Sequence, residues 1–210
     1  MESLKSVPDE PLALARRWLD DAVETGGYNP WAMALSTVDA EGRPACRFVL
    51  LKGFDTRLGF AVFYTNYLSR KAHELDATGW AAASLYWPPA GRQLRLEGRV
   101  TRSPDAESDA YFASRPRASQ LNAWVSAQSH PLSAVGLEPV LASFEGKFPE
   151  DTEVPRPPGW GGYRIWLDSV EFWVEGAARF HERVRYTRDI RDDGAGGFAG
   201  SDWQHVRLQP

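Results

Sequence analysis

The strongest constraint on the fold is a series of short runs with the pattern of β-strands, separated by turn-forming residues. The clearest is residues 94–100, where Leu, Leu, Gly and Val alternate with polar side chains. Because successive side chains of a strand point to opposite faces of a sheet, this run predicts a strand with one buried face. Residues 39–42 (DAEG) supply turn chemistry between the apolar runs 31–38 and 45–51. These two runs are therefore expected to form a hairpin.

Similar signals extend over the rest of the chain. Runs rich in branched and aromatic residues predict further strands at residues 60–65, 80–87, 163–167, 170–174, 184–188 and 203–208. Helical spacing and capping residues predict helices at residues 12–23, 69–77, 105–113, 119–127 and 135–148. The glycine-rich residues 192–201 predict a hairpin loop. The expected fold class is mainly β with peripheral helices, and about eight or nine strands suit an antiparallel barrel.

Length and composition indicate how this fold is organised. The chain has 210 residues, of which 43% are hydrophobic and 25% are charged, and these proportions exclude a mainly disordered protein. We expect an N-terminal helical segment over residues 1–29 and one barrel domain over residues 30–210.

The net charge and the single cysteine limit which partners the protein is expected to bind and in which cellular compartment it is expected to reside. With 24 basic and 28 acidic residues, the net charge of −4 opposes general attraction to nucleic acid or to anionic membranes. Cys46 has no second cysteine with which to form an internal disulfide. The polar N-terminus lacks the apolar stretch of a signal peptide, and no apolar run is long enough for a transmembrane helix. The prediction is a cytoplasmic protein without a nucleic-acid or membrane partner.

Several catalytic motifs can be set aside. Gly194 and Gly196 superficially match a dinucleotide fingerprint, but no strand–helix–strand unit surrounds them. The Gly-x-Ser-x-Gly elbow of serine hydrolases does not occur. The four histidines show no metal-ligand spacing, so we predict no metal site.

Basic and hydroxyl residues next to the predicted strands form a first candidate site. Arg47 and Lys52 are expected on one strand, Tyr64 and Thr65 end another, and residues 70–71 (Arg-Lys) open a helix behind Ser69. Guanidinium groups and a helix N-terminus both favour a bound anion. The alternative interpretation is ordinary solvated surface charge.

Two further clusters lie later in the chain. Tyr111, Arg115 and Ser119 have a spacing of four residues, which brings their side chains together if the segment is helical, although Pro116 interrupts that helix. The second cluster is Trp173 followed by residues 179–183 (RFHER), which offer an aromatic ring, guanidinium groups and an imidazole. Each cluster could also be ordinary surface.

The order of these clusters resembles one known family. The matching motifs are residues 47–52 (RFVLLK), 63–66 (FYTN), 69–72 (SRKA), 92–93 (RQ), 111–120 (YFASRPRASQ), 124–129 (WVSAQS), 160–164 (WGGYR), 171–173 (EFW), 179–183 (RFHER) and 207–210 (RLQP). Any one of them is weak, but together and in this order they resemble the pyridoxine/pyridoxamine 5′-phosphate oxidase family.

That resemblance implies an FMN-binding split β-barrel with a Greek-key-like antiparallel topology, and a homodimer with FMN at the subunit interface. The implied FMN contacts are Arg47, Phe48, Val49, Leu50, Leu51, Lys52, Tyr64, Thr65, Arg70, Lys71, Gln93, Gln128, Ser129, Trp173 and Arg183. The implied substrate contacts are Lys52, Tyr111, Arg115, Ser119, Arg179 and His181, and the last two are the expected catalytic residues.

The implied activity is the oxidation of pyridoxine 5′-phosphate or pyridoxamine 5′-phosphate to pyridoxal 5′-phosphate. In this reaction O2 accepts the electrons and becomes hydrogen peroxide. Three alternatives stay open: an FMN oxidase of secondary metabolism such as phenazine biosynthesis, a non-catalytic flavin- or haem-binding split barrel, and a deazaflavin-dependent reductase. Lys52 and the cluster of Tyr111, Arg115 and Ser119 favour the oxidation of a B6 vitamer phosphate over the phenazine-type activity, because these residues suit a phosphorylated substrate.

Overall fold

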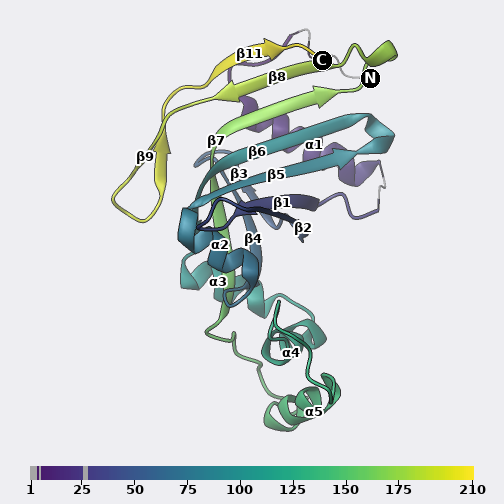
Figure 1. The fold of residues 1–210 in the computed structure, drawn as a ribbon, viewed down its shortest axis with the longest axis vertical. Helices are drawn as coiled ribbons and strands as arrows, with labels where there is room; N and C mark the ends of the chain where they lie inside the picture. The colour runs from purple at the N-terminus through teal and green to yellow at the C-terminus, as the bar shows by residue number, and fades with distance from the viewer. Residues whose placement is uncertain (1–3, 5, 26–27) are drawn as a thin grey trace.

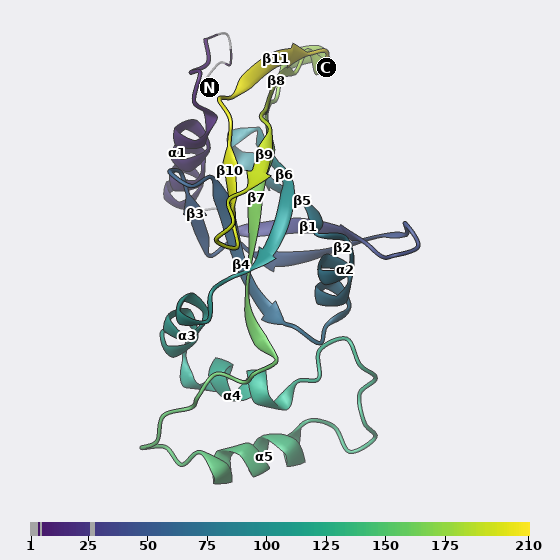
Figure 2. The same cartoon turned by 90° about the vertical axis from the view of Figure 1, so that its left-hand side faces the viewer.

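A large antiparallel sheet forms the body of the protein, and helices lie beside it and beyond one of its ends (Figure 1). The structure is a computed structural model that describes residues 4, 6–25 and 28–210. The α-helices in these ranges are α1 (Pro11–Glu24), α2 (Arg70–Thr78), α3 (Asp105–Ala113), α4 (Arg117–Val125) and α5 (Glu138–Lys147). Figures 1 and 2 both place α4 and α5 together beyond one end of the sheet. Within the described ranges, no helix combines the length and apolar character that crossing a bilayer requires.

The strands of the described residues are more numerous than the sequence predicts. They are β1 (Ala32–Val38), β2 (Pro44–Leu50), β3 (Gly53–Asp55), β4 (Phe60–Asn66), β5 (Trp80–Trp87), β6 (Arg92–Arg102), β7 (Trp160–Val174), β8 (Glu182–Thr187), β9 (Ile190–Asp192), β10 (Phe198–Gly200) and β11 (Gln204–Leu208). Strands β3, β9 and β10 were not predicted, because a strand of three residues shows too little alternation to be recognised in the sequence. Strands β9 and β10 pair across the hairpin predicted at residues 192–201.

Strand β7 divides the sheet into a barrel and an extension. One edge of β7 pairs with β6 along its length, while its other edge pairs first with β4 and then with β8. Strands β6, β5, β1 and β2 follow in order, and β3, which comes directly after β2, pairs with β4. Strand β4 in turn pairs with β7, and the chain after β2 reaches β4 through a hydrogen bond from Lys52 N to Val62 O, so the described part of the barrel has no ladder between β2 and β4. Strands β8 and β11 extend the sheet beyond the barrel. The architecture agrees with the expected antiparallel barrel with peripheral helices.

The prediction of two strands at residues 163–167 and 170–174 was wrong, since β7 runs through both. The register with β6 shifts between Glu97 and Gly98, so Asp168 is an extra residue between the pairs that Leu167 and Ser169 make. A Cβ on Gly98 would lie 1.8 Å from the carbonyl oxygen of Trp166, so the bulge requires glycine there. The polar Asp168 interrupts the apolar pattern without ending the strand.

Helix α1 shares the core of the barrel. Its buried face belongs to the same hydrophobic cluster as the strands. The Trp18 ring meets the edge of Phe172 on β7 at 5.0 Å, and the Arg92 guanidinium lies 4.9 Å from the centre of the Trp18 ring. The described part of the predicted N-terminal segment is therefore packed onto the barrel. Residues 1–3, 5, 26 and 27 of that segment lie outside the described residues.

Truncating Trp18 is expected to destabilise the protein severely. Trp18→Ala should lower the free energy of unfolding by about 3–5 kcal/mol, because it leaves a cavity between α1 and β7. Asp20→Ala on the exposed side of α1, which removes only an ion pair with Arg16, should change it by less than about 0.5 kcal/mol. Denaturant unfolding of both variants at one protein concentration makes the comparison. Similar values for the two would show that α1 does not depend on the shared core.

Candidate functional site

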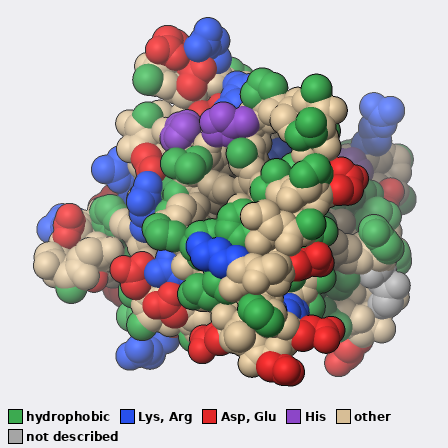
Figure 3. All heavy atoms as spheres, turned by 90° about the horizontal axis from the view of Figure 1, so that it is seen from below, with side chains coloured by type: hydrophobic (Ala, Val, Ile, Leu, Met, Phe, Trp, Pro, Cys, Tyr) green, Lys and Arg blue, Asp and Glu red, His purple; other side chains and the backbone are tan. Residues whose placement is uncertain are grey.

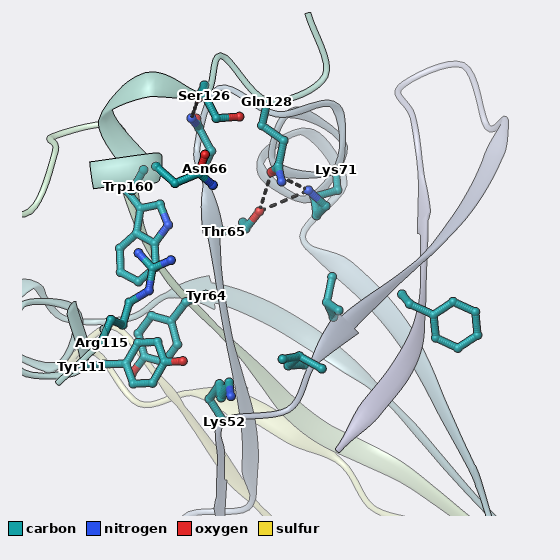
Figure 4. A pocket seen from close by; sticks show the side chains of 15 residues that line it. Lys52, Tyr64, Thr65, Asn66, Lys71, Tyr111, Arg115, Ser126, Gln128 and Trp160 are labelled. Carbon is teal, nitrogen blue, oxygen red and sulfur yellow. Dashed lines mark hydrogen bonds between the residues drawn. The ribbon is translucent and has the colours of Figure 1, made fainter. Parts of the chain in front are cut away.

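A cavity of ≈ 310 Å³ opens where the end of β2 with the residues after it, β4, the start of α2 and the α3–α4 region meet (Figure 4). Its lining includes these predicted site residues: Phe48, Val49, Leu50, Lys52, Tyr64, Thr65, Lys71, Tyr111, Arg115 and Gln128. It also includes Asn66, Asn122, Ala123, Ser126 and Trp160, which the sequence analysis did not assign to the site. Of these, Asn66, Ser126 and Trp160 lie in the matched motifs FYTN, WVSAQS and WGGYR, so the motifs already contained a signal for them.

Lys71 forms the polar end of the cavity (Figure 4). The side chain is buried, with 7% exposed, and Nζ donates hydrogen bonds to Thr65 Oγ1 at 3.1 Å and Gln128 Oε1 at 2.9 Å. Nζ also donates to Oγ of Ser69 at 3.2 Å. Ser69 occupies the N-cap position of α2 as predicted, but its side chain makes no capping hydrogen bond. The first turn of α2 thus presents an ammonium group held by neutral acceptors.

The environment of Lys71 lowers the pKa of its ammonium group. Burial disfavours the charged ammonium, and the nearby positive charge of Arg47 acts in the same direction. The opposing attraction of Glu74 is smaller, so the pKa of Lys71 falls to about 8. A bound anion next to Nζ would favour the protonated form again.

Aromatic rings and Arg115 form the other end of the cavity. Tyr64 and Tyr111 stack at 3.9 Å, and Trp160 lies nearly parallel to both. The Arg115 guanidinium lies 4.7 Å from the centre of the Trp160 ring, and burial lowers the pKa of Arg115. Arg115 Nη1 is buried and has no hydrogen-bond partner among the described residues. Since unpaired buried donors are costly, this atom indicates a place for an anionic ligand.

The two ends share an electrostatic property. Among the described residues, neither Lys71 nor Arg115 forms a salt bridge with a carboxylate, although both are largely shielded from water. Figure 4 shows Arg115 and Lys71 on opposite sides of the same cavity. The cavity is therefore suited to anionic groups at two separate points.

The structure corrects the predicted placement of Arg47 and Lys52. Strand β2 ends at Leu50, so the two residues do not share a strand. After Leu50 the chain changes partner: Leu51 N donates to Trp31 O, whereas Lys52 N donates to Val62 O on β4. Lys52 consequently lines the cavity, while the guanidinium of Arg47 bonds to Thr37 and Glu74 and is not part of the lining.

Arg70 and Lys71, predicted to act together, line different cavities. Arg70 and Ser129 line a neighbouring cavity of ≈ 480 Å³ between α2 and the β1–β2 turn. Successive residues of a helix point about 100° apart, so adjacent positions in the first turn of α2 reach different spaces.

Tyr111, Arg115 and Ser119 are brought together only in part. Helix α3 ends at Ala113 and α4 begins at Arg117, so the predicted helical spacing of four does not hold across Pro116. Tyr111 and Arg115 still line one cavity because the α3–α4 link folds Arg115 over Trp160. Ser119 lies in the first turn of α4 and is not part of the lining.

The remaining predicted residues form a separate cluster on the sheet extension. Gln93, Trp173 and Arg183 are in register across β6, β7 and β8. The His181 ring lies 4.6 Å from the Trp173 ring, and Arg183 Nη2 donates to Glu171 at 2.7 Å. None of these side chains, nor Arg179, lines the cavity. One chain therefore carries the predicted site in two parts.

Other kinds of site find little support in the described residues. No three His, Cys, Asp or Glu side chains in those ranges come together to hold a metal ion. On the face seen in Figure 3, basic and acidic side chains are interspersed among hydrophobic ones, so that this face carries no continuous basic patch.

Two family models match the chain. The model described as pyridoxamine 5′-phosphate oxidase matches residues 19–141. The model described as pyridoxine 5′-phosphate oxidase C-terminal dimerisation region matches residues 160–210. The first range contains the cavity residues of β2, β4 and α2, and the second contains the members of the separate cluster that follow β6, from Trp173 to Arg183.

Curated relatives match over nearly the full length. A pyridoxine/pyridoxamine 5′-phosphate oxidase of Rubrobacter xylanophilus is 48% identical over 202 residues, covering 96% of this chain and 87% of the relative. One of Bradyrhizobium diazoefficiens is 44% identical, covering 96% of this chain and 90% of the relative.

Solved structures share the fold. PhzG of Burkholderia lata 383, in complex with tetrahydrophenazine-1-carboxylic acid, has a TM-score of 0.86 and 31% identity, and the match covers 100% of this chain and 97% of PhzG. A pyridoxamine 5′-phosphate oxidase-related, FMN binding protein of Nostoc punctiforme has a TM-score of 0.70 and 19% identity, covering 99% of this chain and 100% of that one.

Proposed function

The chain belongs to the pyridoxamine 5′-phosphate oxidase family, and from this membership we propose that it oxidises pyridoxine or pyridoxamine 5′-phosphate to pyridoxal 5′-phosphate. The cofactor is FMN, and O2 is the electron acceptor and yields hydrogen peroxide. The observation that carries the proposal is the buried, unpartnered Arg115 Nη1 in a cavity that also holds Lys71. Two cationic points in one cavity suit a phosphorylated cofactor and a phosphorylated substrate.

The polar end of the cavity suits the FMN phosphate. Lys71 Nζ, Thr65 Oγ1 and the Gln128 amide form one connected group at the N-terminus of α2, where the helix dipole adds to the attraction for an anion. The bound flavin supplies the capacity to accept a hydride from the substrate carbon. The protein's task is to hold that carbon in place and to stabilise charge.

The opposite end suits the substrate phosphate. We assign Lys52, Tyr111 and Arg115 to this group, with Ser119 as a further predicted contact. Arg179 and His181 are proposed to orient the alcohol or amine that is oxidised and to exchange protons with it. Gly176 N donates to His181 Nδ1 at 3.2 Å, so Nε2 is the ring nitrogen left to face the substrate.

We propose that two copies of the chain complete each site, because His181 and its neighbours do not line the cavity of their own chain. The outer face of the sheet offers exposed apolar residues for this contact, including Phe48 (77% exposed) and Tyr86 (53% exposed). The match to a dimerisation region supports this arrangement. Apart from the second copy and the phosphorylated substrate we propose no partner, and we propose a cytoplasmic location.

The solved PhzG structure raises a second candidate, an oxidase acting on a phenazine precursor. Its 31% identity is below the 44–48% of the curated B6 oxidases. The unpartnered Arg115 also favours a substrate with a phosphate group. The B6 vitamer is therefore the better supported substrate.

Cofactor release tests the proposal directly. We expect purified protein to be yellow and to release FMN, not FAD, on denaturation, as identified by chromatography. Incubation with pyridoxine 5′-phosphate should then yield the product aldehyde and peroxide. A colourless protein that takes up no added FMN would contradict the oxidase assignment.

The lowered pKa of Lys71 predicts a pH-dependent affinity for FMN. The FMN phosphate is a dianion above about pH 7, so the change in charge between pH 7 and 9 comes from Lys71. Because the pKa of Lys71 in the free protein is about 8, affinity should be nearly constant below pH 8. Above pH 8 binding must take up a proton, and affinity should fall by up to about tenfold per pH unit.

Fluorescence titration of the apoprotein with FMN measures this profile. Riboflavin, which lacks the phosphate, is the matched ligand and should show no step near pH 8. Lys71→Gln should bind FMN more weakly and remove the step. If the affinity of wild type for FMN stays constant from pH 7 to 9.5, Lys71 does not bind the FMN phosphate.

A further inference from the structure

One buried carboxylate joins two of the predicted FMN residues. Glu74, in the second turn of α2, is 4% exposed. Its Oε2 accepts a hydrogen bond from Arg47 Nη2 at 2.8 Å, and its Oε1 accepts one from Arg70 Nε at 2.7 Å. Thr37 on β1 donates to the same Oε2, and its own hydroxyl accepts a hydrogen bond from Arg47 Nη1. Side chains from β1, β2 and α2 therefore meet at this carboxylate.

The hydrogen bonds keep Glu74 ionised. Burial alone would raise the pKa of Glu74, but hydrogen bonds from Thr37, Arg70 and Arg47 outweigh this effect and hold the pKa below its usual range. At neutral pH the carboxylate is a permanent counter-charge for both guanidinium groups.

The geometry leaves binding capacity on Arg70. Glu74 uses only Nε of Arg70, so both Nη groups can serve another acceptor. The Arg70 side chain is 62% exposed, and without this contact a long, exposed arginine would sample many rotamers. Arg47 is more enclosed, at 21% exposed, and is also held by Thr37.

Neither guanidinium group lines the cavity of Lys71, but Arg70 directly precedes Lys71 on α2, and the positive charge of Arg47 acts on Lys71. We propose that Glu74 is a positioning residue that orients Arg47 and Arg70 toward an FMN phosphate bound at Lys71. This inference rests on the proposed function, because it assumes that the chain binds FMN. Glu74 acts through the two arginines, and the proposal places no contact between Glu74 and the cofactor. Preorganised guanidinium groups lose less conformational freedom when the phosphate binds, so affinity is higher.

The direction in which FMN affinity changes when Glu74 is removed distinguishes a positioning role from a purely electrostatic one. A carboxylate near a phosphate site repels a dianion, so its removal would tighten FMN binding if Glu74 acted only through its charge. If Glu74 holds the arginines, its removal weakens FMN binding. The two interpretations predict opposite changes.

The test compares FMN with riboflavin on the apoprotein of wild type and Glu74→Gln. The neutral amide of the variant keeps the size of the side chain but loses charge-assisted hydrogen bonds to two guanidinium groups. We expect the dissociation constant for FMN to rise about tenfold or more, while that for riboflavin changes less than about twofold. Equal losses for both ligands would indicate general damage to the fold and would overturn the proposal. So would unchanged or tighter FMN binding.

Two further variants keep the test decisive. Glu74→Asp retains the buried charge but shortens the side chain by one methylene, so that it cannot reach both arginines. This variant should also weaken the binding of FMN more than that of riboflavin, and wild-type affinity for FMN in this variant would overturn the proposal. Glu41→Gln removes an exposed carboxylate from the same neighbouring cavity, where Glu41 pairs with Arg43, and it should not weaken FMN binding. If wild type itself binds no FMN, the proposed function fails and the role of Glu74 fails with it. If wild type binds FMN and Glu74→Gln binds it equally well, only the role of Glu74 fails.

Discussion

Arg115→Ala is expected to lower kcat/KM for pyridoxine 5′-phosphate by about two to three orders of magnitude, and to leave the much lower kcat/KM for unphosphorylated pyridoxine nearly unchanged. In the proposed site the substrate phosphate pairs with the buried Arg115 Nη1, which has no hydrogen-bond partner among the described residues. Pyridoxine without a phosphate leaves that donor and its charge unpaired, which costs about 1–3 kcal/mol for each such group. The variant removes this discrimination, so the preference for the phosphorylated substrate should shrink.

Steady-state rates of aldehyde formation for both compounds, measured at saturating FMN, test this prediction. Ser119→Ala should cause a smaller loss than Arg115→Ala, because Ser119 is outside the cavity lining. Arg191→Ala, which removes an exposed positive charge on β9, is the control for net charge and should leave the ratio unchanged. Equal use of both substrates by wild type, or an unaltered ratio in Arg115→Ala, would favour the phenazine-type alternative.

Mixed dimers of two inactive variants should recover activity. Arg115 lines the cavity, whereas His181 lies beside Trp173 on the sheet extension. If each site takes Arg115 from one chain and His181 from the other, a dimer of Arg115→Ala and His181→Ala has one doubly altered site and one intact site. Such a dimer should show about half of wild-type turnover, although each parent homodimer is nearly inactive.

Co-expression with two different tags and sequential affinity purification isolates the mixed dimers. The matched control pairs Arg115→Ala with Lys52→Ala, since both residues line the same cavity and no intact site can form. The FMN content of the preparation that combines Arg115→Ala and His181→Ala should stay near that of wild type, because both residues are assigned to the substrate. Absence of recovery in the first pair would contradict a site shared between chains. Recovery in both pairs would contradict the assignment of Arg115 and Lys52 to the same site.

The sequence determined the class of the fold and the family. Strand periodicity is local, so alternation and turn residues were sufficient to predict most of the longer strands, including β5 and β6. The order of short motifs predicted the family to which the chain belongs, and the family matches over residues 19–141 and 160–210 confirm that prediction. The individual roles of the site residues stay predictions, and the cavity contains only part of the predicted set.

Tertiary structure decided the features that depend on contacts between distant segments. Asp168 could become a bulge instead of a strand end only because Gly98, on the neighbouring strand β6, pairs with Leu167 and leaves room for the extra residue. Strands β6 and β7 are far apart in the sequence. The pKa of Lys71 depends on burial by other segments, and the bond between Arg47 and Glu74 joins β2 to α2. Local patterns predict which way a side chain points along its own strand or helix. They do not encode what the neighbouring segment brings to meet it, and that neighbour determines whether a buried charge is paired, shifted in pKa or free to bind a ligand.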